Sequence, residues 1–188
     1  MRKLKLQMQV SLDGYVAGEG GTLDWMVWNW DDELKNYVVG ITEAVDLILL
    51  GRNLAEGFIP HWGAAALDQQ NPEVEFAKLM TDTPKIVFSR TIQESPWQNT
   101  TIINECNVNE INDIKSSPGK DIIVYGGAAF VSSLVEQGLI DEYHLFINPV
   151  ALGKGMTIFG GLASRLNLKL VNSKAFDCGI VVLFYQPA

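Results

Sequence analysis

The chain has 188 residues, of which 47% are hydrophobic and 19% are charged, and its formal net charge at pH 7 is −8. This acidic balance argues against a nucleic-acid-binding protein, which would carry a basic face. No apolar run reaches the ~20 residues that span a bilayer, and the basic N-terminus lacks the apolar stretch of a signal peptide. We therefore expect one cytoplasmic globular domain over residues 1–188, with a core of ordinary size.

Cysteine and histidine are too few and too dispersed for a metal cluster. Cys106 and Cys178 form no CxxC pair, and His61 and His144 are the only histidines. No zinc site with the usual spacing can be written from these four residues. We expect no metal, and two thiols that are not joined in a disulfide.

The apolar pattern predicts strands and helices that alternate along the chain. Strands are expected at residues 4–10, 45–50, 84–88, 100–103, 122–125, 143–148, 166–170 and 181–185. Helices are expected after a cap at Asp31, from Asn71-Pro72-Glu73, over residues 108–115, and from about residue 128 to Gly138. The segment 54–70 is expected to be irregular, because it contains several glycines and a proline, with a helix over part of it as the alternative. This order predicts an α/β domain with a mostly parallel central sheet and antiparallel C-terminal strands.

Three of the expected strands end in residues that suit anions. They end at Gly51-Arg52-Asn53, Ser89-Arg90-Thr91 and Gly126-Gly127-Ala128. Open α/β sheets bind ligands at the carboxyl ends of their strands. The first and third turns can offer helix N-terminal N–H groups to a pyrophosphate, and the second pairs a hydroxyl with a guanidinium for a phosphate monoester.

A phosphorylated dinucleotide such as NADP would use all three turns. A Rossmann site is not expected, because no GxGxxG follows the first strand. The alternative is that the glycine pair only shapes a tight connection and that Arg52 and Arg90 are solvated surface residues.

These turns resemble the NADPH-binding motifs of the dihydrofolate reductase-like superfamily, and within it the reductase domain of riboflavin biosynthesis. Further segments that match are Ser11-Leu12-Asp13-Gly14, residues 138–143, Asn148-Pro149-Val150 and Gly153-Lys154-Gly155. The resemblance covers nearly the whole chain. It implies a dihydrofolate reductase-like three-layer α/β fold and an NADPH-dependent reductase of a pyrimidine- or pteridine-like heterocycle, such as 5-amino-6-(5-phosphoribosylamino)uracil reductase.

The resemblance also implies roles for single residues. Ser89 and Arg90 would hold the 2′-phosphate, and Gly126, Gly127 and Ala128 would hold the pyrophosphate. Gly51, Arg52 and Asn53 would form the other turn on the phosphate side. The nicotinamide would lie beside Val16, Ala17 and Gly18. Asn53 stands where the family commonly has threonine, although asparagine can also cap a helix. The H-x-E and PCxxC patterns of the zinc deaminase that is often fused to this reductase are absent.

The proton donor is left open. Candidate acids near the first loop are Asp13, Asp24, Asp31, Asp32 and Glu33, and tryptophans follow at Trp25, Trp28 and Trp30. A carboxylate among these rings would have a raised pKa, and the rings could stack on a flat heterocycle. Alternatively, Asp31 and Asp32 are cap and surface residues, Asp13 shapes a turn, and the tryptophans form core or dimer contacts. We expect Asp24, Trp25 and Asp32 to lie nearest the substrate.

Two other functions stay open at this stage. One is a catalytically silent nucleotide-binding or regulatory protein on the same fold, and the other is a flavin-dependent protein. We also expect a homodimer in which the tryptophans and the antiparallel C-terminal strands form a shared apolar face.

Overall fold

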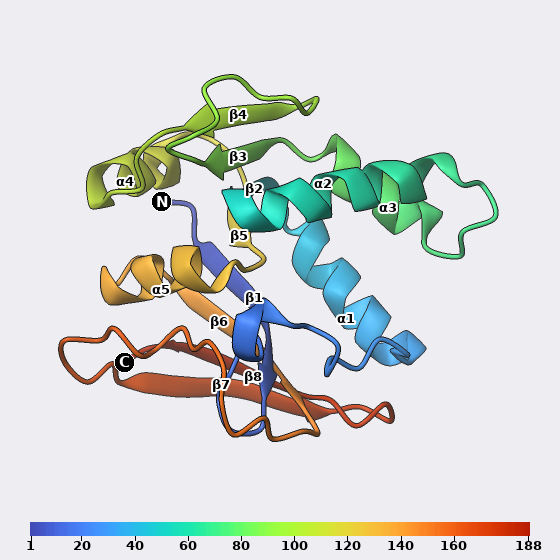
Figure 1. Ribbon diagram of the computed structural model, residues 1–188, viewed down its shortest axis with the longest axis vertical. Helices are drawn as coiled ribbons and strands as arrows, with labels where there is room; N and C mark the ends of the chain where they lie inside the picture. Colours follow the sequence, from blue (N-terminus) through green and yellow to red (C-terminus); the bar gives the residue numbers. More distant parts are fainter.

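A computed structural model describes all 188 residues as one eight-stranded sheet between two layers of helices (Figure 1). The strands are β1 Leu4–Ser11, β2 Val45–Gly51, β3 Lys85–Phe88, β4 Thr100–Ile103, β5 Asp121–Val124, β6 Glu142–Asn148, β7 Leu168–Ala175 and β8 Val181–Pro187. Their order across the sheet is β4-β3-β2-β5-β1-β6-β8-β7. Strands β1 to β6 pair in parallel, whereas β7 and β8 pair antiparallel, which confirms the predicted sheet.

The helices are α1 Asp32–Glu43, α2 Arg52–Leu67, α3 Val74–Asp82, α4 Val108–Ser116 and α5 Ala128–Glu136, with a 3-10 turn η1 at Glu19–Gly21. One apolar core joins α4 and α5 to one face of the sheet, and a second core joins α1, α2 and α3 to the other face. The molecule therefore has the three layers that were expected. None of the helices combines the length and the apolar character of a membrane-spanning segment.

Strand β1 lies in the middle of the sheet, between β5 and β6. Its residues Leu4, Leu6 and Met8 are buried in the core beneath α5. The residues between them point to the α1 side, because side chains alternate along a strand. On that side Gln7 is also buried, so a polar side chain lies inside the molecule.

Helix α1 begins as its sequence predicts. The carboxylate of Asp31 accepts a hydrogen bond from the Leu34 N–H at 2.8 Å and another from the Cys178 N–H at 3.1 Å. These bonds lower the pKa of Asp31, with the Leu34 N–H as the largest cause. Asp31 is therefore a helix cap, as one of the two alternatives held, and not a proton donor.

The expectation of an irregular segment over residues 54–70 is wrong, because α2 runs without interruption past Pro60. Aromatic packing explains the difference. Trp62 packs edge-on against Phe76 of α3 with ring centroids 5.2 Å apart, and Phe58 packs on Tyr125 at 5.3 Å. Such tertiary contacts outweigh the helix-breaking tendency of the proline.

The start of α3 also differs from the prediction. The helix begins at Val74, and Asn71 lies before it, where its side chain accepts a hydrogen bond from the Glu73 N–H at 2.9 Å. Asn71 therefore shapes the turn that precedes the helix and does not cap the helix itself.

Candidate functional site

The three anion-competent turns lie side by side at one rim of the sheet. Strands β3, β2 and β5 are neighbours and run in parallel, with Gly51 opposite Phe88 and Leu49 opposite Val124. The turns that follow these strands are therefore adjacent (Figure 1). Phe88 also stacks on Phe130 of α5, with ring centroids 5.1 Å apart.

Two helices begin at this rim without a side-chain cap. Helix α2 follows Gly51 and helix α5 follows Gly127, and neither N-terminus receives a hydrogen bond from a capping side chain. Gly127 has φ of 84°, which residues with a Cβ rarely adopt. Two uncapped N-termini present N–H groups and positive dipole ends, a combination that binds phosphate groups.

A cavity of about 920 Å³ opens at these N-termini. Its wall is largely apolar and comes from β1, α1, α2, α3 and the turns before α2 and α5. The residues assigned to the cofactor that line it are Val16, Ala17, Gly51, Arg52, Asn53, Gly126, Gly127 and Ala128. The assigned residues outside its wall are Gly18, Ser89, Arg90, Asp24, Trp25 and Asp32.

The turn after β3 lies at the outer edge of this cavity. Phe88 lines the wall, whereas Ser89 is buried and its Oγ accepts hydrogen bonds from the N–H groups of Thr91 and Ile92, at 3.2 and 3.0 Å. The Ser89 hydroxyl thus shapes its own turn. Arg90 is exposed and forms no ion pair, so its guanidinium is available to a ligand.

The first turn of α2 differs from the expectation in one detail. Gly51 occupies the cap position, and Asn53 is the second residue of the helix, so Asn53 does not cap it. Arg52 lies 3.0 Å from the carboxylate of Glu56, one helical turn further on. To bind an anion, the guanidinium of Arg52 must therefore break its exposed ion pair with Glu56 or contact both groups at once.

The loop after β1 is held against the loop 150–156. Val16 N–H donates to the Met156 carbonyl, and Met156 N–H donates to the Ala17 carbonyl, each at 2.8 Å. Val16 and Ala17 are buried, at 3% and 6% exposure. This pairing fixes the part of the cavity wall that was expected beside the nicotinamide.

Asp13 joins the same two loops. Its carboxylate accepts hydrogen bonds from Ser11 Oγ at 2.6 Å, Gly153 N–H at 2.7 Å and Leu152 N–H at 3.0 Å. These bonds, first that from Ser11, lower the pKa of Asp13 to about 2. Asp13 is therefore ionised near neutral pH and serves as a loop clamp, in agreement with the turn-shaping alternative.

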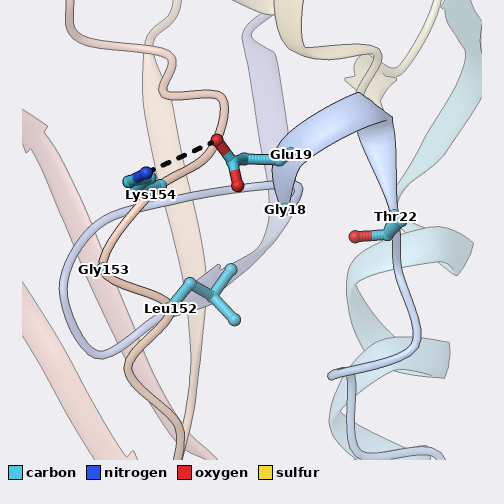
Figure 2. A pocket seen from close by; sticks show the side chains of 6 residues that line it. All are labelled: Gly18, Glu19, Thr22, Leu152, Gly153 and Lys154. Carbon is cyan, nitrogen blue, oxygen red and sulfur yellow. Dashed lines mark ion pairs between the residues drawn. The ribbon is translucent and has the colours of Figure 1, made fainter.

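Gly18 borders a second hollow instead of the cavity. This hollow of about 550 Å³ is formed by Gly18, Glu19, Thr22, Leu152, Gly153 and Lys154. Figure 2 shows Glu19 and Lys154 turned toward each other across it, with 4.0 Å between their charged atoms. Glu19, Thr22, Gly153 and Lys154 of this hollow are exposed, whereas Gly18 is buried, so the hollow lies on the outer side of the paired loops.

The structure separates the three tryptophans of the first loop. Trp28 and Trp30 line the cavity and stack on each other at 6.1 Å, and Trp30 also stacks on Phe146 of β6 at 6.2 Å. Trp25 turns away and donates its indole N–H to the Thr22 carbonyl. The aromatic wall therefore consists of Trp28 and Trp30, and the placement of Trp25 nearest the substrate is not seen.

The candidate acids of this region all lie outside the cavity wall. Asp24 and Asp32 are exposed, and Glu33 pairs with Lys174 at 2.6 Å. Asp24 and Asp32 therefore do not line the cavity in which the substrate was expected. The loop carries both carboxylates to the surface, whereas Leu23 and Met26 line the cavity with Trp28 and Trp30.

Several polar residues of the cavity wall were not anticipated. They are Gln7 and Gln9 of β1, Lys35 of α1, His61 of α2, Glu73, and Tyr125 after β5. Lys35 and Glu73 face each other at 3.6 Å across the gap between α1 and α3. Burial raises the pKa of Tyr125, whose hydroxyl lies 3.1 Å from that of Thr42.

Residues 2–182 match the RibD C-terminal domain family. The chain belongs to the RibD C-terminal domain family. It is 36% identical over 187 residues to the uncharacterized protein YyaP of Bacillus subtilis (strain 168), and the match covers 98% of this chain and 95% of YyaP.

Solved structures share the fold of this chain. A putative riboflavin biosynthesis protein from Shewanella sp. PV-4 superposes with a TM-score of 0.72 at 24% identity, over 100% of this chain and 99% of that one. The deaminase/5-amino-6-(5-phosphoribosylamino)uracil reductase of Thermotoga maritima gives 0.71 at 20% identity, and this chain covers 57% of it. These likenesses confirm the predicted dihydrofolate reductase-like fold.

Proposed function

We propose that this member of the RibD C-terminal domain family is an NADPH-dependent reductase of a pyrimidine- or pteridine-like heterocycle. The observation that supports the proposal is the pair of uncapped helix N-termini, at Gly51 and Gly127, on the edge of a largely apolar cavity with an aromatic wall. The helix N-termini suit the phosphates of a dinucleotide, and the aromatic wall suits flat rings.

The residues present fit NADPH along this rim. The N–H groups at the starts of α2 and α5 would bind the pyrophosphate, with Arg52 near it. Arg90 lies two residues past the strand residue Phe88 and would meet the 2′-phosphate at the outer edge. The buried loop at Val16 and Ala17 would lie against the nicotinamide.

The chain's own contribution is position and environment. When bound, the cofactor supplies the hydride. The apolar cavity wall excludes water, which strengthens polar contacts within it. The stack of Trp28 on Trp30, and of Trp30 on Phe146, would provide a fixed aromatic surface at the cavity wall for the ring that accepts the hydride. None of the carboxylates of the first loop lines the cavity. The proton that accompanies the hydride is therefore not expected to come from that loop.

Cofactor titration tests the proposal directly. We expect NADPH to bind at least about tenfold more tightly than NADH, because only NADPH carries the phosphate for Arg90. The loss of NADPH absorbance with a panel of pyrimidines and pterins should then identify a reducible substrate. Equal affinity for NADPH and NADH would contradict the assignment.

The same experiment separates the alternatives. Tight NADPH binding without oxidation by any compound of the panel would favour a catalytically silent nucleotide-binding protein. A purified protein with the yellow colour and spectrum of a bound flavin would favour the flavin-dependent alternative.

We also propose a homodimer, formed through the edge strand β7. This strand ends the sheet, and it exposes Leu170 and Val171 at 49% and 47%. An open edge strand that exposes two apolar side chains favours pairing with a second copy. Light scattering should report a dimer, and Leu170→Lys with Val171→Lys should give a monomer. Leu67→Lys on α2, where the leucine is 83% exposed, is the matched control and should leave the mass unchanged.

A further inference from the structure

Gln7 presents an unpaired carboxamide at the floor of the cavity. The residue lies on the central strand β1, is 7% exposed, and lines the cavity wall. Its Oε1 is buried and has no hydrogen-bond partner in the protein. Two other buried polar atoms share this condition, on Tyr143 and His144, but neither residue lines the cavity. Gln7 is thus the buried, unpaired polar group that faces the site.

A buried carboxamide without partners is unfavourable, because its lost bonds to water are not replaced. A carboxamide carries an acceptor and a donor side by side. The group that complements both is a lactam edge, in which a ring N–H lies next to a ring carbonyl. If the oxygen and nitrogen of the Gln7 side chain exchange places, the donor and the acceptor only swap positions. The carboxamide therefore complements a lactam edge in either orientation.

The neighbouring glutamine is held in one orientation. Gln9 lies on the same face of β1, and its Oε1 accepts a hydrogen bond from Asn148 Nδ2 at 2.8 Å. Asn148 in turn accepts from the Val27 N–H, also at 2.8 Å. The Nε2 group of Gln9 has no protein acceptor and lines the same cavity, which adds a second donor beside Gln7.

The aromatic wall lies next to these carboxamides. Gln9 is paired with Phe146 across the β1–β6 ladder, and Phe146 carries the stacked ring of Trp30. A flat ring that stacks on this wall would turn its edge toward β1. The charged side chains of the wall at α1 and α3, Lys35 and Glu73, are paired with each other. The floor is therefore neutral and polar, which favours an uncharged ring edge over a carboxylate.

We propose that Gln7 recognises the substrate by two hydrogen bonds to a lactam edge of its heterocycle, with Gln9 as an adjoining donor. The proposal rests on the reductase function proposed above and specifies which ring edge the site selects.

Binding of two matched pyrimidines tests the role of Gln7. The probes are 5,6-diaminouracil, whose lactam edges are free, and its 1,3-dimethyl derivative, in which both ring nitrogens are blocked. With saturating NADP⁺, calorimetry on the wild type should show at least about tenfold tighter binding of the free lactam. Gln7→Leu should remove this difference and leave the affinity for NADPH unchanged.

Gln98→Leu is the control, because Gln98 is exposed and precedes β4 at the other rim of the sheet. It should keep the discrimination between the probes. The melting temperature of the ligand-free protein gives a second readout. Gln7→Leu should raise it, since an unpaired buried carboxamide is replaced by an apolar group of similar size. A lower melting temperature would mean that Gln7 is a structural group, and would overturn the proposal.

The outcomes separate the two proposals. In the first case NADPH binds, but Gln7→Leu still discriminates between the probes, or the wild type binds neither probe or both equally. The proposed role of Gln7 is then wrong, while the cofactor assignment stands. If NADPH does not bind, the reductase function fails, and the same probes in the absence of cofactor still decide whether Gln7 binds a lactam.

Discussion

Gly51 and Phe130 lie so close together that a Cβ on Gly51 would come within 2.8 Å of the Cβ of Phe130. The glycine ends β2 and caps α2, while the phenylalanine lies in the first turn of α5. The two uncapped helix starts are therefore in direct contact. The glycine is required for this close approach and not for an unusual backbone angle, since its φ is −77°.

Gly51→Ala should displace the first turn of α5. We expect a loss of about 1–3 kcal/mol in the free energy of unfolding, as for other overpacked sites, together with weaker NADPH binding. Urea denaturation and cofactor titration measure the two effects. Gly40→Ala is the matched control, because Gly40 lies in α1 with no atom near its missing Cβ. That variant should gain about 0.5–1 kcal/mol. Equal stability of the two variants would refute the close-contact argument.

Arg90→Ala should weaken NADPH binding without affecting NADH. Loss of a charge-assisted contact to the 2′-phosphate costs about 1.5–3 kcal/mol, which corresponds to an affinity lower by roughly ten- to a hundredfold. Fluorescence titrations with both cofactors give the ratio. Arg165→Ala removes another exposed arginine that forms no ion pair, and it should bind both cofactors as the wild type does. An equal loss for NADPH and NADH would show that Arg90 does not contact the 2′-phosphate.

Glu56→Gln should free Arg52 for the cofactor. The Arg52–Glu56 pair is exposed on both sides, and such pairs contribute about 0.3–0.5 kcal/mol. We expect NADPH affinity to rise about twofold at low salt, with the gain reduced at high salt by screening. Glu75→Gln, which breaks the comparable surface pair with Lys78, should leave the affinity unchanged. A decrease in affinity for Glu56→Gln would place Arg52 away from the phosphates.

Asp13→Asn should alter the acid stability of the protein. The pKa of Asp13 falls from 3.8 to about 2 on folding, so its stabilisation is complete above roughly pH 4 and is lost as the pH falls toward 2. The variant should therefore lose less stability than the wild type over that interval. Hydrogen exchange at the amides of Leu152 and Gly153 should be faster at neutral pH, because both donate to this carboxylate.

Asp24→Asn provides the comparison for Asp13, because Asp24 is exposed and accepts no hydrogen bond. Its melting temperature should follow that of the wild type at every pH. If Asp13→Asn shows the same pH profile as Asp24→Asn, the clamp does not contribute to stability.

The rim that carries the three turns could be predicted from the sequence because its signals are local. A short apolar run that ends in Gly51-Arg52 or in Gly126-Gly127 predicts both a buried parallel strand and the helix that follows it. Parallel strands bring their carboxyl ends to one rim whatever their order, so the shared rim followed without knowledge of the topology. That the three turns are adjacent comes from the order β3-β2-β5 in the structure. The full length of helix α2 could not be predicted, since Gly57, Pro60 and Gly63 disfavour a helix locally. The helix is stabilised by its packing on α3 and Tyr125.

The substrate end could not be predicted in the same way. Residues 12–30 follow a path set by contacts with distant loops, such as Ala17 with Met156, and no periodicity records those contacts. The glutamines of β1 carried a usable signal, because Gln7 and Gln9 alternate with apolar residues. Such alternation by itself is typical of a strand with one face open to solvent. Only the packing of α1, α2 and α3 over that face of the sheet shows that Gln7 is buried.

The central position of β1 has a consequence for synthesis of the protein on the ribosome. The strand at Leu4–Ser11 emerges first, yet both of its neighbours, β5 from Asp121 and β6 from Glu142, are translated only after most of the chain. During translation the apolar residues of β1 therefore stay unpaired until β5 and β6 have been made. Over that time they are exposed to solvent or bound by a chaperone.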